Sequence, residues 1–214
     1  MANICENNEY IFGPKDQMSK LYDIFDKMFE DPKNEFHPIS FIIKSLELED
    51  LHLYSRCEIL EYVKDYDEIE NIYILSFSSD SAWNSMYETW DEILKEKFPD
   101  CKYAFLSIEP GCEVFEVSDP YDRFGISDYY VNIDINICGE EANKELPKVI
   151  RDLVEKYKDD MIYDSWNEDE VRSFIKNLCN IEKDISTEGL LELLEEWNNL
   201  NEYVYVSIHP YLLI

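Results

Sequence analysis

The residues best suited to chemistry in this chain are carboxylates close to one predicted turn. Glu109 directly precedes Pro110-Gly111 at the expected end of a strand, and Asp119, Asp122 and Arg123 follow in the next predicted loop. If the loop folds back onto Glu109, its carboxylates could hold a divalent cation, as in metal-dependent hydrolases. The same Glu-Pro-Gly sequence is also typical of a plain turn with an exposed Glu, because Pro fixes φ and Gly supplies positive φ.

Local motifs for catalysis or cofactor binding are missing. None of His37, His52 and His209 lies beside a Ser or Cys in a recognised catalytic motif, and neither glycine-rich phosphate-binding pattern occurs. The six cysteines lack the close spacing of zinc ligands and are interpreted as buried free thiols. We therefore predict no catalytic residue, no metal site and no cofactor. The candidate binding residues are Trp83, Glu109, Asp119, Asp122 and Arg123.

The net charge excludes a general nucleic-acid binder. Nineteen Lys and Arg residues against 48 Asp and Glu residues give a formal charge of −29, and the basic residues are scattered singly. Such a surface repels phosphate and anionic lipid. The 14% aromatic content is too high for a disordered acidic tail. Two interpretations remain open: the acidic surface attracts a basic protein partner, for instance by imitating a phosphate backbone, or it only keeps the protein soluble.

The compartment is expected to be the cytoplasm. The N-terminal residues have neither the basic start nor the apolar stretch of a secretory signal. No apolar run approaches the roughly 18 residues of a membrane span. Free thiols persist in a reducing compartment. The sequence therefore predicts a protein without membrane contact, and it does not predict the oligomeric state.

Apolar spacing predicts alternating strands and helices over the first 139 residues. The expected strands are 4–12, 39–48, 101–108, 112–117 and 129–137, with a hairpin formed by 57–63 and 69–77 around a turn at 64–68. The expected helices are 14–29 and one that follows Ser78–Ser81 and runs through Trp83 to Phe98. Ser78 to Ser81 would cap the second helix, and Trp83 would then either line a pocket or belong to its apolar stripe.

The composition after Gly139 is mostly helical. The expected helices are 141–157, one opened by a capping box at 167–170, and one capped by Ser186 or Thr187. A strand at 203–208 and an apolar tail at 211–214 follow, and the tail is expected to pack on the body. We therefore predict two parts, a domain at 1–139 and a mostly helical extension with a final strand at 140–214.

The repeated strand-helix-strand order predicts an α+β protein. The expected architecture is a ferredoxin-like, split βαβ antiparallel sheet with helices on one face, followed by the helical C-terminal extension. No sequence period is visible, so a solenoid is not expected.

Several segments in order resemble a known family. They are Met1–Asn7, Phe77–Trp83, Lys97–Pro99, Glu109–Gly111 and Gly125. Together they are similar to the YubB-type ferredoxin-like proteins of bacterial plasmids, phages and other mobile elements, over about the first two thirds of the chain. Two positions depart from the family: Ile4 replaces the usual Trp, and residues 51–56 replace a Trp-Gly-Thr-containing stretch. The resemblance implies a fold and a mobile-element setting, without an activity.

These observations lead to one main functional hypothesis and two alternatives. The main hypothesis is a cytoplasmic interaction or regulatory protein that uses its acidic surface on a basic partner, without catalysis. The first alternative is a divalent-metal-dependent hydrolase or nuclease-like enzyme with carboxylates near Glu109 and Asp122. The second is a small-molecule binding module that uses the sheet face without helices.

Overall fold

The chain folds into two compact units of mixed α and β structure. The structure is a computed structural model, and it describes residues 3–30, 36–120, 123–124, 128–135, 146–157, 161–183, 185–201 and 203–214. The first unit comprises Met1–Phe124 with Leu212–Ile214, and the second comprises Gly125–Tyr211. Among the described residues, no helix is long and apolar enough to cross a membrane.

The first unit is built on a six-stranded sheet in the order β2-β3-β1-β4-β5-β9. Neighbouring strands are antiparallel, except that β9 runs parallel to β5. Strand β1 is central and pairs with both β3 and β4, so that Tyr10 faces Ser76 on one side and Ala104 on the other. The strands are β1 (Ile4–Gly13), β2 (Cys57–Asp67), β3 (Ile72–Ala82), β4 (Lys102–Glu109), β5 (Val114–Ser118) and β9 (Leu212–Leu213).

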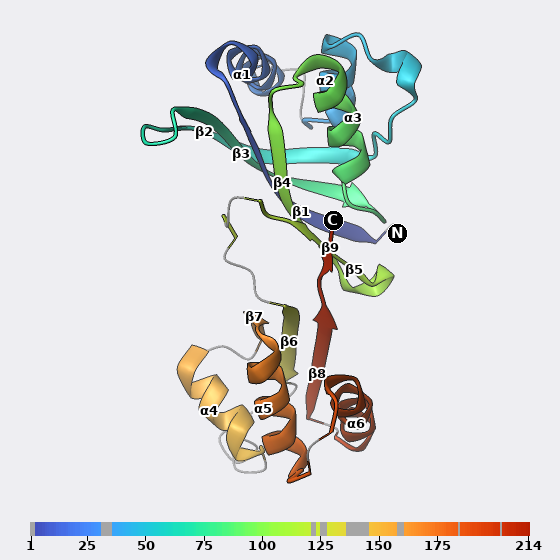
Figure 1. The fold of residues 1–214 in the computed structure, drawn as a ribbon. Coiled ribbons are helices and arrows are strands. Elements are labelled where there is room, and N and C mark those ends of the chain that lie inside the picture. The colour runs from blue at the N-terminus through green and yellow to red at the C-terminus, as the bar shows by residue number, and fades with distance from the viewer. Residues whose placement is uncertain are drawn as a thin grey trace. The chain divides into compact units, whose positions relative to one another are not determined.

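Helices α1 (Lys15–Glu30), α2 (Ile39–Ser45) and α3 (Tyr87–Lys97) lie on one side of this sheet (Figure 1). The α1 residues Met18, Leu21, Phe25 and Met28 recur at intervals of three and four, and all are buried. The ring of Phe25 packs against Phe77 of β3 at 5.3 Å and against Trp90 of α3 at 6.4 Å. An aromatic core therefore joins the helices to the centre of the sheet.

Several elements predicted for this unit are confirmed. The strands expected at 4–12, 101–108 and 112–117 correspond to β1, β4 and β5, and the helix expected at 14–29 corresponds to α1. The two arms of the hairpin are also present as β2 and β3, but the turn lies at 68–71. It is displaced because the carboxylate of Asp67 accepts hydrogen bonds from the backbone N–H groups of Ile69 and Glu70.

The strand predicted at 39–48 is wrong, because residues 39–45 form α2. Four consecutive residues, Ser40 to Ile43, fit a buried strand and a short helix equally well. The helix buries Ile39, Ile42 and Ile43, whose spacing of three and four matches a helical face. Pro38 precedes it at the N-cap position with a φ of −72°.

The helix predicted to follow a cap at Ser78–Ser81 instead begins at Tyr87, after β3 has continued to Ala82. Ser79 and Ser81 are buried strand residues. The hydroxyl of Ser79 donates to Glu9, and the hydroxyl of Ser81 accepts from the amide of Asn7. These serines therefore satisfy polar groups inside the sheet and do not cap a helix.

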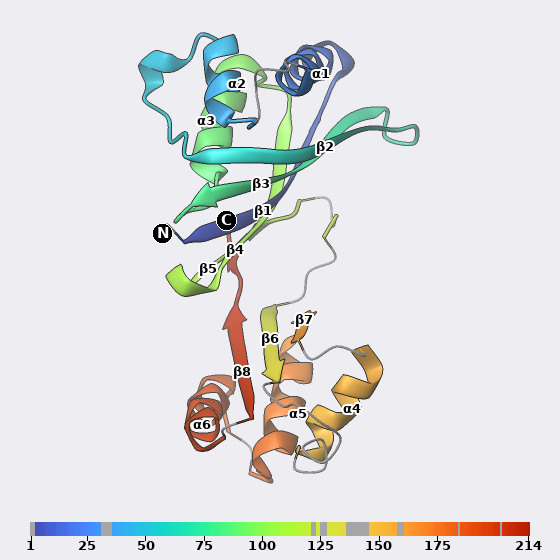
Figure 2. The ribbon, with the colours of Figure 1, turned by 180° about the vertical axis from the view of Figure 1, so that it is seen from behind.

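The second unit contains a three-stranded antiparallel sheet and three helices. β6 (Tyr129–Ile135) lies between β7 (Met161–Trp166) and β8 (Val204–Pro210), and Figure 2 shows it from behind. The helices are α4 (Lys148–Tyr157), α5 (Glu168–Cys179) and α6 (Thr187–Leu200). Alternate strand residues face the helices, as the sequence pattern predicted for β6. The buried strand residues of this core are Val131, Ile133, Ile135, Trp166, Val204, Val206 and Ile208.

Predictions for the second unit agree in part with the structure. The capping box at Asn167 and Glu170 is present, and Ser186 caps α6. The described part of the first predicted helix is α4, and residues 136–145 lie outside the described residues. Strand β7 was not predicted. Because β6 belongs to this unit, the units divide between Phe124 and Gly125, whereas the sequence pattern predicted a boundary after residue 139.

The C-terminal tail packs on the first unit, as predicted. Leu212 and Leu213 pair with Glu116 and Val117 of β5, and the N–H of Ile214 donates to the carbonyl of Val117 at 3.0 Å. The side chain of Leu213 is nevertheless 82% exposed. Backbone pairing, more than burial of its leucines, therefore holds the tail.

A row of polar side chains crosses the core beneath the helices of the first unit. Glu9 on the central strand is 1% exposed, and its two carboxylate oxygens accept hydrogen bonds from Ser79 and Tyr103, each at 2.6 Å. Burial raises the pKa of Glu9 to about 7, against the lowering effect of these hydrogen bonds. The carboxylate is thus held by neutral hydroxyl groups.

This environment predicts a pH-dependent stability. The folded-state pKa of Glu9 lies above its ordinary value of 4.5. The contribution of Glu9 to the free energy of unfolding is therefore fully present below pH 4.5 and is lost as the pH rises to about 7. We expect Glu9→Gln to remove roughly 3 kcal/mol of this variation. Urea unfolding from pH 5 to pH 8 measures it, with the exposed Glu6→Gln on the same strand as control. A constant difference between wild type and Glu9→Gln across this range would contradict the expectation.

Candidate binding groove

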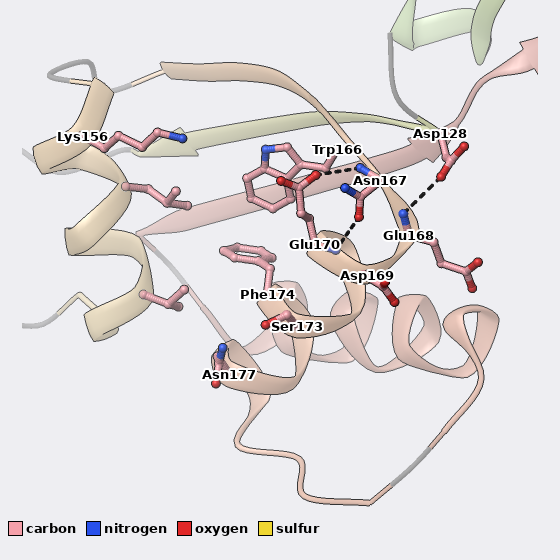
Figure 3. Close-up of a pocket in the computed structure, with 12 residues that line it drawn as sticks. Asp128, Lys156, Trp166, Asn167, Glu168, Asp169, Glu170, Ser173, Phe174 and Asn177 are labelled. Carbon is pink, nitrogen blue, oxygen red and sulfur yellow. Dashed lines mark hydrogen bonds between the residues drawn. The ribbon is translucent and has the colours of Figure 1, made fainter.

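A groove of about 700 Å³ lies between α4 and the N-terminal part of α5 (Figure 3). Its walls come from both helices, from the end of β7 and from the residue before β6. The lining residues are Asp128, Val149, Leu153, Lys156, Trp166, Asn167, Glu168, Asp169, Glu170, Ser173, Phe174 and Asn177. A second hollow of about 440 Å³ shares Val149 and Asn177 and continues to Asn180 at the end of α5.

The floor of the groove is apolar and aromatic. The rings of Trp166 and Phe174 pack edge to face, with centroids 5.0 Å apart and an interplanar angle of 68°. Both residues are largely buried, and the half-buried Val149 and Leu153 complete the apolar wall on α4. An occupant of the groove can therefore bury apolar groups against a packed surface.

Asp164 fixes the indole of Trp166. The Nε1–H of Trp166 donates to the carboxylate at 2.9 Å, and the hydroxyl of Tyr157 donates to the same oxygen. Lys156 in turn donates to the Tyr157 hydroxyl at 2.7 Å. Partial burial would raise the pKa of Asp164, but the hydrogen bonds from Tyr157, Trp166 and the N–H of Ser165 outweigh it and lower this pKa. The carboxylate of Asp164 thus fixes the orientation of the Trp166 ring, which forms part of the floor.

The rim at the start of α5 is acidic. Asp128, Glu168, Asp169 and Glu170 carry four negative charges, and Lys156 carries one positive charge, so the formal charge of the lining is −4 + 1 = −3. Asp169 is exposed at this rim. A binding site with this charge favours a cationic occupant.

The helix start itself offers little to an anion. The side chain of Asn167 accepts from the N–H of Glu170 at 3.0 Å, and the carboxylate of Glu170 accepts from the N–H of Asn167 at 2.9 Å. The carboxylate of Asp128 accepts from the N–H of Glu168 at 3.2 Å. The N–H groups of Asn167, Glu168 and Glu170 are therefore bonded to side chains of the chain and are not available to a phosphate or a carboxylate.

Two residues predicted from the sequence, Trp83 and Glu109, lie at the same end of the first sheet. Glu109 ends β4 and is 7% exposed. Trp83 follows β3, is 43% exposed, and has a φ of 79°, which is rare for a bulky residue. Its N–H donates to the carbonyl of Asn3 at 3.1 Å, and Gly111 lies against the side chains of both Asn3 and Glu109. Trp83 is thus an exposed residue after a strand and not part of a helical stripe.

Asp119 and Arg123 lie at the other end of the β4–β5 hairpin. Glu109 pairs with Val114, whereas Phe105 pairs with Ser118, four residues away along each strand or about 13 Å. The structure therefore does not bring Asp119 or Arg123 to Glu109. Asp122 lies outside the described residues.

Asp119 and Arg123 hold their own loop against the sheet. The carboxylate of Asp119 accepts from the N–H groups of Arg123 and Phe124, each at 2.8 Å. The guanidinium of Arg123 lies 5.5 Å from the ring centre of Phe12, and its Nη2 is 3.4 Å from the carboxylate of Asp67. Within the described part of the chain, no group of three or more His, Cys, Asp or Glu side chains is arranged to hold a metal ion.

The groove was missed by sequence analysis, although one signal for it was present. The capping box at Asn167 located the start of α5 and the carboxylates that now form the rim. Nothing in the sequence indicated that α4 would lie beside them, or that Asp164 would orient Trp166. Recognising β7 would have placed Asp164 and Trp166 on one strand face, two residues apart.

The network behind the floor predicts a measurable loss of stability. We expect Asp164→Asn to destabilise the protein by about 2 kcal/mol at pH 7, because hydrogen bonds to a charged group are lost. The lowered pKa means that this contribution is present above about pH 4 and disappears as the pH falls through the folded-state pKa. Urea unfolding at pH 7 and pH 3 tests both points, with the exposed Asp152→Asn on α4 as control. Equal effects of the two substitutions at pH 7 would contradict the role of Asp164.

Comparison with known proteins assigns no family to this chain. No family model, no curated protein and no solved structure matches it. The shape, packing and charge of the groove are therefore the features that indicate a binding site.

Proposed function

We propose that the protein is a non-catalytic interaction protein that binds a basic segment of a partner protein in the α4–α5 groove. The observation that carries the proposal is the combination of an acidic rim with an apolar floor that is already packed. Either feature alone is common on protein surfaces. Together they match a segment that carries both cationic and apolar side chains.

The two features have different energetic roles. An exposed ion pair at the rim contributes at most about 1 kcal/mol, because water and salt screen it. Burying one apolar side chain on the floor contributes about 1.5–3 kcal/mol. The floor therefore supplies most of the affinity, while the rim and the net charge of −29 select and attract basic partners.

We infer for the first unit a YubB-type ferredoxin-like fold and a mobile-element setting. The strand order β2-β3-β1-β4, with α1 and α2 between β1 and β2 and with α3 between β3 and β4, supports a split βαβ sheet. Two segments of the resemblance, which end at Trp83 and Gly111, approach each other through Asn3. A cytoplasmic location accords with the free cysteines among the described residues.

Charge reversal at the rim tests the proposed function. A fluorescent peptide with lysines and leucines on opposite faces is titrated with the protein, and binding is followed by anisotropy at 50 and 300 mM salt. We expect binding that weakens at high salt, and a further loss of about five-fold for Asp169→Lys, equivalent to about 1 kcal/mol.

The matched control is Glu195→Lys, which makes the same change of net charge at an exposed position on α6 outside the groove. Equal weakening by both variants would mean that only the overall field attracts the peptide. No binding at 50 mM salt would contradict the proposed function altogether.

A further inference from the structure

We propose that the groove accepts its partner as an amphipathic α-helix, with the basic end of that helix over the start of α5. This inference rests on the proposed function and specifies the form of the segment that binds. It follows from the hydrogen-bonding state of the groove walls, the dimensions of α5 and the uneven charge of the rim.

The groove walls offer few backbone partners to an extended peptide. The walls are mainly the two helices, whose backbone N–H and C=O groups bond within each helix. At the start of α5, the side chains of Asn167, Asp128 and Glu170 accept from three of the N–H groups that the helix leaves free. An extended segment on the apolar floor would leave most of its own backbone groups without partners, which is costly when they are buried. A helix satisfies these groups internally.

Strand addition is also blocked at the β8 edge of the sheet. The side-chain amide of Asn198, on α6, donates to the carbonyl of Val206 at 2.7 Å and accepts from the N–H of the same residue at 3.0 Å. This amide occupies the backbone groups that an added strand would use in the middle of β8. A partner segment therefore cannot extend the sheet there, whereas the helical groove is free of such a block.

The dimensions and charges of the groove define the helix. α5 has 12 residues and is about 18 Å long, so an occupant beside it needs about three turns. Apolar residues at positions i, i+3 or i+4, and i+7 would contact Leu153, Phe174 and Val149.

The carboxylates cluster at the start of α5, whereas Ser173 and Asn177 farther along are uncharged (Figure 3). Lys or Arg residues therefore belong at the end of the partner helix that lies over Asp128 and Asp169.

Two peptides of identical composition test the helical form. Each has 14 residues, a leucine stripe, lysines at one end and a single proline. In the first peptide the proline occupies the first helical position, where it is tolerated, and in the second it lies at a solvent-facing position in the middle, where it breaks the helix. We expect the second peptide to bind at least tenfold more weakly, and the first to gain helical circular dichroism on binding. A photo-crosslinker at the lysine end should label residues 167–170.

The possible outcomes separate the two proposals. Equal affinity of both peptides, with the loss caused by Asp169→Lys retained, would overturn the helical form and leave the proposed function standing. Labelling near Asn180 from the lysine end would overturn the orientation. Failure of both peptides to bind would contradict the proposed function itself. Leu153→Ala, which removes an apolar side chain from the groove, is expected to weaken the binding of the first peptide several-fold. The matched control is Glu155→Ala on the exposed side of α4.

Discussion

This chain has 48 acidic and only 19 basic residues, so it has too few cations to pair with each carboxylate. Most carboxylates that are fixed within the fold must therefore accept hydrogen bonds from neutral donors. Glu9 is held by the hydroxyls of Ser79 and Tyr103, and Asp164 by the side chains of Tyr157 and Trp166. Elsewhere backbone N–H groups are the donors, as at the carboxylate oxygens of Asp67, Asp119, Asp128 and Glu170. These contacts shape the hairpin turn, the loop after β5 and the start of α5. Among the described residues, the carboxylates therefore act more often as acceptors from neutral donors than as members of ion pairs.

Neutral donors leave the charge of a carboxylate in place, and this has opposite effects in the two units. In the first unit the charge of Glu9 is buried, so desolvation raises its pKa and the folded state is favoured when the proton is bound. In the second unit the rim carboxylates face water and stay available to a cation. A carboxylate that accepts a backbone N–H has fixed orientation and still attracts positive charge. The capping contacts of α5 thus preorganise the rim without neutralising it.

The sequence predicted the elements whose local signals agree with their environment. The α1 stripe, the alternation in β6 and the capping box of α5 are examples. Predictions were wrong where a residue type has two roles. Ser79 and Ser81 suit a helix cap and also suit a buried strand that needs hydroxyl donors, and Glu9, 70 residues away from Ser79, decides between them. Likewise, Ser40 to Ile43 fit a strand or a helix, and tertiary packing selected α2.

The candidate groove was harder to predict than the fold, because none of its residues carries a sequence signal for binding and the site forms only through contacts between separate elements. Trp166 becomes a floor only when Asp164 orients it and Phe174 packs against it, and both contacts depend on the pairing of β7 with β6. The rim poses the same problem. Asp128 and Glu170 bind N–H groups of α5, and Glu168 accepts from Thr187 at 2.5 Å, so their positions are set by the fold. Asp169 points from the same turn without such a structural contact to the described residues, which makes it the rim carboxylate whose charge is most free to serve recognition.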